Sequence, residues 1–170
     1  MSEATRKITE GLQHAMRAET DGYHFYSMAS KNIQDAKGRE VFEALAQEEL
    51  SHLRYLKIQF NSYNDSGGAD TSARLGARRD LSGEHPIFSD DFKSRIKNAH
   101  FEMSALSIAI LLELNSERYY REQAQATGDP DAKDFFNQLA DWESGHYHAL
   151  LQQQESLKED YWAAGGFAPF

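Results

Sequence analysis

Residues 42–52 read FEALAQEELSH, and residues 136–146 read FNQLADWESGH. Both stretches place a glutamate three residues before a histidine, and apolar residues at helical spacing precede each pair. Residues three apart lie on the same side of an α-helix, so each Glu-x-x-His can present two side chains to one ion. The two stretches decide the fold because they are matched parts of an internal repeat.

The repeat appears when the chain is compared with itself at an offset of 94 positions, where it matches without a gap. The identical pairs are Leu12/Leu106, Ala15/Ala109, Glu19/Glu113, Tyr26/Tyr120, Asp35/Asp129, Phe42/Phe136, Leu45/Leu139, Ala46/Ala140, Glu49/Glu143, His52/His146 and Leu56/Leu150. Most of these residues are typical of a core, and the exceptions include two glutamates and a histidine. The pattern predicts two copies of one helical hairpin, each carrying a Glu and then a Glu-x-x-His.

Helix-forming residues dominate the sequence, and only three prolines occur. We expect four long helices, over residues 4–32, 36–63, 92–126 and 130–162. The connections near Asp35 and at Thr127–Pro130 are short, which forces antiparallel neighbours. Residues 64–91 are rich in Gly, Ser and Asp and are predicted to form a long crossover with a short helical piece. The expected fold class is all-α, a four-helix bundle that forms one domain over residues 1–170.

Each predicted helix carries an acidic residue in the middle of an apolar or small inward-facing row. The row in the first helix is Ile8, Leu12, Ala15, Glu19, Gly22, Tyr26, Ala29 and Ile33. An unpaired buried carboxylate costs on the order of several kcal/mol, and four that face one another also repel. Protonation or salt bridges could relieve this, but two divalent cations match four carboxylates best.

The predicted metal ligands are the three repeated pairs, Glu19, Glu49, His52, Glu113, Glu143 and His146. Carboxylate oxygen and imidazole nitrogen without sulfur favour iron or manganese over structural zinc. The simplest alternative is a plain helical bundle whose acids lie on the surface. The recurrence of all six residues in register across the repeat favours a metal site over this alternative.

The composition excludes several classes of protein. The chain has no cysteine, which rules out disulfides, thiolate metal sites and iron–sulfur clusters within this sequence. Its net charge of -9 argues against nucleic acid as a partner, because phosphate binding needs clustered cations. No apolar run is long enough to span a bilayer, and no secretory signal stands at the N-terminus. We therefore expect a cytoplasmic protein with no membrane partner.

The ordered set Glu19, Glu49-Leu-Ser-His52, Glu113 and Glu143-Ser-Gly-His146 resembles the ferritin-like di-iron carboxylate proteins. Within them the chain is similar to the rubrerythrin group, through residues 42–52, residues 105–113 and the following Tyr119-Tyr120. The resemblance implies two iron ions per chain, with a manganese–iron pair as an alternative. It also implies that Glu49 and Glu143 bridge the ions, and that Glu19 and Glu113 are terminal ligands.

The resemblance further implies reduction of hydrogen peroxide or dioxygen, with ferroxidase activity or iron storage as the alternative function. A non-enzymatic scaffold with a vestigial site is a third hypothesis, disfavoured by six intact ligand candidates. Two departures from the rubrerythrin pattern matter. The cysteine-binding rubredoxin domain has no counterpart here, so we expect a separate electron donor such as a rubredoxin-like protein. An additional Glu of that family is replaced by Ser116, and we expect Gly22 and Ser116 to leave space for the oxidant.

Two tyrosines and one acidic residue lie close to these ligands in the predicted helices. Tyr26 and Tyr120 lie two turns after the single glutamates, where they could pack in the core or hydrogen-bond near the metals and deliver protons. Glu48 is predicted to lie on a solvated helix face, and Arg78-Arg79 in a solvated loop.

We expect a homodimer, the commonest soluble assembly.

Overall fold

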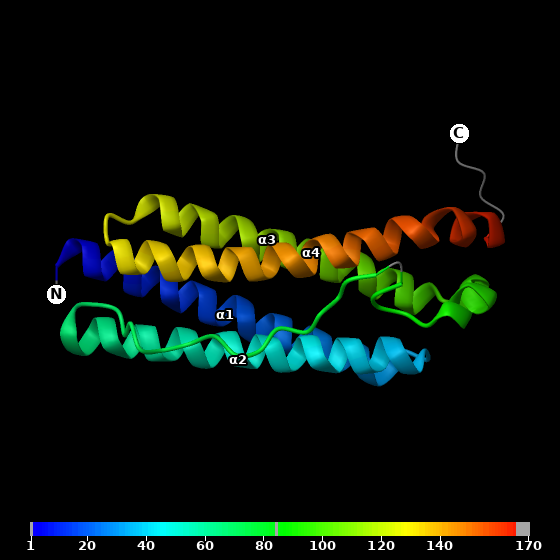
Figure 1. Ribbon diagram of the computed structural model, residues 1–170, viewed down its shortest axis with the longest axis horizontal. Coiled ribbons are helices and arrows are strands. Elements are labelled where there is room, and N and C mark those ends of the chain that lie inside the picture. The colour runs from blue at the N-terminus through cyan, green and yellow to red at the C-terminus, as the bar shows by residue number, and fades with distance from the viewer. Residues whose placement is uncertain (1, 84, 166–170) are drawn as a thin grey trace.

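The computed structural model describes residues 2–83 and 85–165, which form a bundle of long helices (Figure 1). Its elements are α1 (Glu3–Asn32), α2 (Ala36–Ser66), the 3₁₀ helix η1 (Asp90–Asn98), α3 (His100–Ala126) and α4 (Pro130–Ala164). No β-strand occurs within these described ranges. The predicted all-α four-helix bundle is therefore confirmed. None of the described helices combines the length and the hydropathy that a membrane span requires.

The helices form two antiparallel hairpins, with α1 packed on α2 and α3 packed on α4. The crossover after α2 runs back along the outside of the bundle, beside α2, to the end where α3 begins (Figure 1). Because of this return, α2 and α3 run in the same direction, and so do α1 and α4. The bundle is thus not a simple up-down-up-down arrangement, as the long crossover predicted.

Side-chain caps define where the helices start. The Asp35 side chain accepts a hydrogen bond from the backbone N–H of Gly38 at the start of α2, at 2.9 Å. Its repeat partner Asp129 accepts from the N–H of Ala132 at the start of α4, at 3.1 Å. These bonds satisfy backbone donors that have no partner within the helix. The α2 helix ends at Gly67, whose φ of 79° is a left-handed conformation that glycine adopts without strain.

The predicted start of the third helix at residue 92 is wrong. The chain forms η1 first, and Ala99, with φ -90° and ψ 36°, breaks the helical path before α3 begins at His100. Packing favours this break, because the ring of Phe92 stacks on Phe88 with centroids 4.2 Å apart. Both rings are buried. Only the first two residues of η1 fall within the predicted crossover of residues 64–91, so the helical piece expected there is absent from the described residues between Ser66 and Asp90. The second and fourth helices run two or three residues further than predicted.

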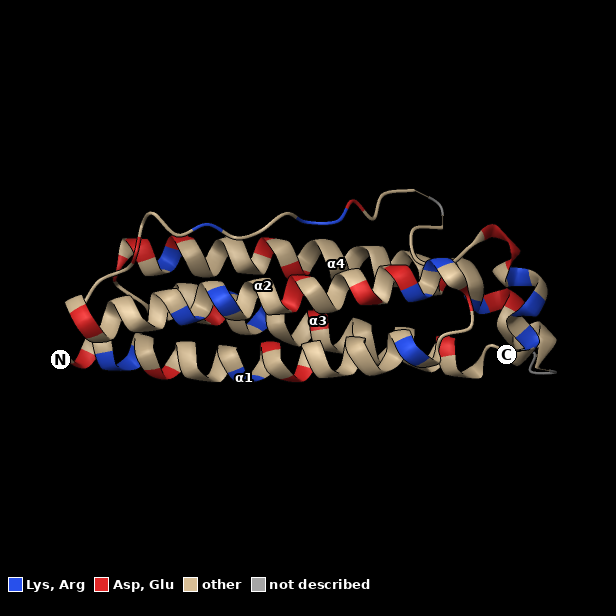
Figure 2. Ribbon diagram, turned by 90° about the horizontal axis from the view of Figure 1, so that it is seen from below, with Lys and Arg blue, Asp and Glu red and all other residues tan. Residues whose placement is uncertain are grey.

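Two apolar clusters hold the helices together on either side of the acidic residues. One contains Phe42, Leu106 and Leu150, and the other contains Leu12 and Phe136, all of them fully or almost fully buried. Burying each such side chain contributes roughly 1.5–3 kcal/mol. The acidic residues lie between the clusters, so both clusters fix the helix positions at that level. On the outside, Lys and Arg are interspersed with Asp and Glu along the helices (Figure 2).

Candidate metal centre

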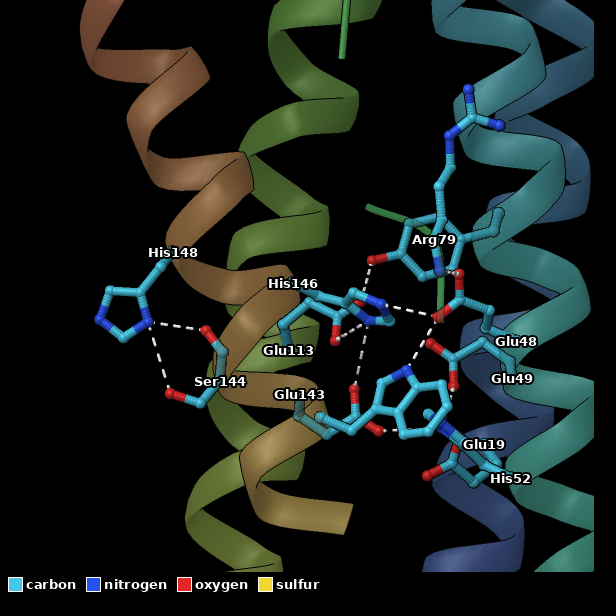
Figure 3. Close-up of polar contacts among 12 residues, drawn as sticks. Glu19, Glu48, Glu49, His52, Arg79, Glu113, Glu143, Ser144, His146 and His148 are labelled. Atoms are coloured by element: carbon cyan, nitrogen blue, oxygen red, sulfur yellow. Dashed lines mark hydrogen bonds and ion pairs between the residues drawn. The ribbon is translucent and has the colours of Figure 1, made fainter. Parts of the chain in front are cut away.

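The six predicted ligands meet in the middle of the bundle, where each of the four long helices contributes at least one of them (Figure 3). None is more than 6% exposed. They form two groups in which ligand atoms lie within 4.8 Å of one another: Glu19, Glu49, His52 and Glu143, and Glu113, Glu143 and His146. Glu143 belongs to both groups. Either group could hold a metal ion.

Both histidines turn Nδ1 toward the carboxylates. Nδ1 of His52 lies 3.0 Å from Oε1 of Glu143 and 3.3 Å from Oε2 of Glu19. Nδ1 of His146 lies 3.5 Å from Oε2 of Glu113. The same ring nitrogen thus faces the centre in both halves of the repeat, and the other nitrogen, Nε2, faces away.

Several buried atoms of this centre have no hydrogen-bond partner in the described part of the chain. They include Oε2 of Glu113, both carboxylate oxygens of Glu143 and Nδ1 of His146. Buried polar atoms are nearly always paired, so this concentration requires an explanation. Converging carboxylate oxygen and imidazole nitrogen atoms fit iron or manganese ions, provided that the imidazole nitrogens give up their protons when a cation binds.

Burial and mutual repulsion perturb the carboxyl groups strongly. Burial, with the neighbouring Glu143 carboxylate, raises the pKa of Glu113 to about 8. Burial and the nearby Glu19 raise the pKa of Glu49 well above its usual range. Glu143 goes the other way: burial would raise its pKa, but the His52 imidazole together with the hydrogen bonds of Glu113 and His146 outweighs burial, and the pKa lies well below its usual range. Glu143 therefore stays charged without a cation.

The imidazoles of His52 and His146 balance the negative charge of the carboxylates. Burial opposes their protonation, but the carboxylates around His52 and around His146 outweigh it and raise the pKa of each ring well above the usual value. Without a cation the centre therefore keeps protons on both histidines. A cation that binds Nδ1 must displace them, so metal binding releases protons.

Tyr26 and Tyr120 donate hydrogen bonds to predicted ligands on the opposite hairpin. The hydroxyl of Tyr26 in α1 donates to Oε1 of Glu113 in α3, and that of Tyr120 in α3 donates to Oε1 of Glu19 in α1. Both tyrosines are buried. They therefore fill core positions and also orient one carboxylate each; their catalytic role stays a prediction.

The predicted solvated position of Glu48 is wrong. Glu48 is only 6% exposed, and its Oε2 accepts a hydrogen bond from Nε2 of His146 at 2.9 Å (Figure 3). The same oxygen accepts from Nε1 of Trp142 at 2.8 Å. The sequence held a signal for this position, because Glu48 lies four residues before His52 and so shares its side of α2.

The predicted solvated loop around Arg79 is also wrong in part. The backbone N–H of Arg79 donates to Oε1 of Glu48 at 2.8 Å, so the crossover closes over this carboxylate. The Arg79 guanidinium pairs with Glu40 at 3.0 Å. Burial alone would raise the pKa of Glu48, but the donors of His146, the Arg79 backbone and Trp142 hold it below the usual value. Glu48 is therefore held between the bundle and the crossover.

A cavity of about 180 Å³ reaches the centre from the side where α1 and α3 lie. Its lining includes Gly22 and Ser116, with Glu49 and Glu113 among the lining residues. A Cβ atom at Gly22 would lie 3.2 Å from Cδ of Glu49, so any larger residue would press on this carboxylate and narrow the cavity. The two small residues that the sequence singled out thus line one opening to the centre.

Comparison with known proteins gives one match. The family model described as Rubrerythrin matches residues 10–154. This range runs from within the first half of α1 into α4 and contains all six residues of the centre. No curated protein and no solved structure matches the chain.

Proposed function

Because this chain belongs to the rubrerythrin family, we propose that it is a non-haem di-iron oxidoreductase that reduces hydrogen peroxide or dioxygen. The observation that carries the proposal is the buried cluster of unpaired carboxylate and imidazole atoms beside a cavity. A ligand cluster with no cavity leading to it would suit an ion with a purely structural role. An approach lined by small side chains suits a small oxidant.

We propose that each ion has one terminal glutamate and one histidine of its own. Glu19 and His52 would hold one ion, and Glu113 and His146 the other. Glu143 would be shared, in keeping with its place in both groups. Glu49 lies in the group with His52, and the resemblance to the family suggests it as the second shared carboxylate. A manganese–iron pair would fit the same donor atoms.

Two bound ferrous ions would supply one electron each, so that hydrogen peroxide and two protons become two water molecules and both ions become ferric. The protein would do the rest. Tyr26 and Tyr120 hold hydroxyl protons against Glu113 and Glu19, where they could be passed on through these carboxylates. With dioxygen as oxidant, the same two electrons and two protons would give hydrogen peroxide.

The cavity beside Gly22 and Ser116 is the proposed approach for the oxidant. About 180 Å³ is ample for peroxide, since a water molecule takes up about 30 Å³ in the liquid. A Ser116→Glu variant would place a longer, charged side chain in this space. We expect it to slow peroxide turnover and change the metal spectra, and unchanged turnover and spectra would contradict this role of the cavity.

The remaining partners belong to the same proposal. The sequence contains no cysteine for a cysteine-bound iron centre, so re-reduction of the ions would require a separate donor, such as a rubredoxin-like protein. We also propose a homodimer. Apolar side chains on α3 are available for such a contact, because Ile108 is 47% and Leu111 58% exposed. Nucleic acid and membranes are not among the proposed partners.

The decisive experiment loads the protein with ferrous iron without oxygen and adds hydrogen peroxide. We expect two irons per chain, and one peroxide consumed for each pair of irons oxidised. Mass spectrometry would count the metal, and ferric absorbance would follow the oxidation. A chain that takes up no iron would contradict the di-iron centre. An iron-loaded chain whose ferrous ions are not oxidised by peroxide or dioxygen would contradict only the proposed activity.

Oxidation of ferrous iron as a substrate is the second candidate. Asp21 and His14 line the same cavity, and such groups can attract a cation as well as an oxidant. A ferroxidase would oxidise many ferrous ions per chain under air. The oxidoreductase would stop after two unless a reductant is supplied. Gel filtration would also separate a dimer from a storage cage.

A further inference from the structure

The two halves of the repeat differ at the residue just before each Glu-x-x-His. This residue is Glu48 in α2 and, 94 positions later, Trp142 in α4. Both side chains reach across to the other hairpin. Glu48 accepts the hydrogen bond of His146 Nε2 at 2.9 Å, whereas the ring of Trp142 lies edge-on to His52, with centroids 5.1 Å apart at 87°. The two histidines therefore have different neighbours behind them.

The difference concerns the outward-facing ring nitrogens. Nε2 of His146 has a charged acceptor, but Nε2 of His52 is buried and has no hydrogen-bond partner among residues 2–83 and 85–165. A carboxylate that accepts from the outer nitrogen of a metal-binding histidine fixes the tautomer and ring orientation, and makes the inner nitrogen a better donor. Only His146 has this support.

Glu48 is well held for this role. The Arg79 backbone N–H fixes one of its oxygens at 2.8 Å, and the Trp142 indole N–H binds the other at 2.8 Å. A carboxylate with three donors cannot turn away from His146 without breaking bonds in a buried place. Its orientation is thus set by both the bundle and the crossover.

The two halves share part of the surroundings of the centre. Each proposed ion position has one terminal glutamate and one histidine, and each terminal glutamate accepts a hydrogen bond from a tyrosine of the other hairpin. Glu143 belongs to both groups of candidate ligands, whereas Glu49 belongs only to the group with His52. On the outward-facing side of the histidines, the difference is the pair of residues 48 and 142.

We propose that Glu48 is a positioning residue that makes the two ion positions unequal, so that the position at His146 binds a divalent cation more tightly than the position at His52. The proposal rests on the metal centre of the proposed function but not on its activity. It adds that the centre fills in a fixed order, first at His146 and then at His52.

Cobalt(II) tests the order of filling without redox chemistry. We expect calorimetric titration of the metal-free protein to give two binding constants. Crystals grown with one equivalent should show anomalous scattering mainly at His146. Equal scattering at both positions, or more at His52, would overturn the proposal. No binding of cobalt(II) or ferrous iron at all would instead overturn the metal centre itself.

A Glu48→Gln variant tests the cause. Loss of the carboxylate is expected to weaken the tighter constant about 10- to 100-fold, the usual effect of removing such a partner, and to leave the weaker one within a few-fold. A merely structural role would weaken both constants together, which would contradict the proposal. Glu43→Gln is the matched control, because Glu43 is an exposed glutamate of the same helix.

The Trp142→Phe variant keeps a ring beside His52 but removes the N–H that binds Glu48. The bond between Glu48 and His146 should survive, so the order of filling should stay the same. A reversed order would show that Trp142, and not Glu48, controls the inequality. Circular dichroism of each variant would show that the helices are intact.

Discussion

The hairpin formed by α1 and α2 and the hairpin formed by α3 and α4 supply the same three inward-facing groups, yet they differ in what surrounds them. Glu19, Glu49 and His52 repeat as Glu113, Glu143 and His146, whereas Glu48 repeats as Trp142 and Gly22 as Ser116. The matched residues form the centre itself. Of the unmatched ones, Gly22 and Ser116 line the cavity beside it, and Glu48 and Trp142 contact its histidines. A repeat can thus keep a common centre while its surroundings diverge.

The largest expected difference between two ligand substitutions is that between Glu143 and Glu19. Glu143 belongs to both groups of candidate ligands, and Glu19 to only one. We expect Glu143→Ala to reduce the metal content from two ions per chain to less than one. Glu19→Ala should retain about one ion. Mass spectrometry of the purified variants would measure this, with Asp141→Asn as an exposed control on α4. Equal losses in the Glu143 and Glu19 variants would contradict the sharing.

The next largest expected effect is the pH dependence of the free energy of unfolding. It should differ between the metal-free and the metal-loaded protein. Burial raises the pKa of Glu113 to about 8, and the pKa values of both imidazoles are raised too. Raised values mean that the folded state holds protons which the unfolded chain has lost, so stability falls as pH rises. The lowered pKa of Glu143 adds no pH dependence of stability at pH values above the ordinary pKa of a glutamate. In that range the Glu143 carboxylate is charged in both the folded and the unfolded chain.

We therefore expect the metal-free protein to be less stable at pH 8 than at pH 6, by roughly 1–3 kcal/mol. Urea unfolding at several pH values would measure the free energy of unfolding. The metal-loaded protein should show the opposite trend, because bound cations replace the protons. A metal-free protein that gains stability with rising pH would contradict the protonated centre.

The two tyrosines provide a sharper comparison, since each supports the terminal glutamate of the other hairpin. Tyr26→Phe and Tyr120→Phe each remove one buried hydrogen bond, worth roughly 1–3 kcal/mol when the acceptor is charged. We expect similar losses of metal affinity for the two variants, about tenfold each. Binding isotherms would measure them. A large loss in one variant only would show that the inequality extends to the tyrosines.

The smallest expected effect concerns Gly22. A Gly22→Ala variant adds a methyl group 3.2 Å from Cδ of Glu49 and narrows the cavity. The better helix propensity of alanine, about 1 kcal/mol, opposes the tight contact, so stability should change little. We expect a few-fold slower reaction with peroxide at unchanged metal content. Ser116→Ala is the matched variant on α3 and should not slow the reaction.

Much of the fold and of the centre could be predicted because they depend on spacing within single helices. Every residue of the inward-facing row from Ile8 to Ile33 is buried in the structure. The burial of Glu48 does not follow from the inward-facing row of α2, which runs through Leu45, Glu49 and His52, because a packed helix buries a stripe wider than one row. The Arg79 contact could not be predicted, because it joins residues 31 positions apart through a loop without a periodic pattern. The break at Ala99 likewise depends on tertiary packing of Phe92.

The crossover has a consequence for the symmetry of the whole molecule. Two identical hairpins could pair with perfect twofold symmetry, but one linker that joins them can lie on only one side. In this chain the linker closes over Glu48 through Arg79, and no equivalent segment can cover the related place at the same time. The single linker therefore makes the two histidine environments different within one chain, since the carboxylate behind His146 is closed off by the crossover and the ring beside His52 is not.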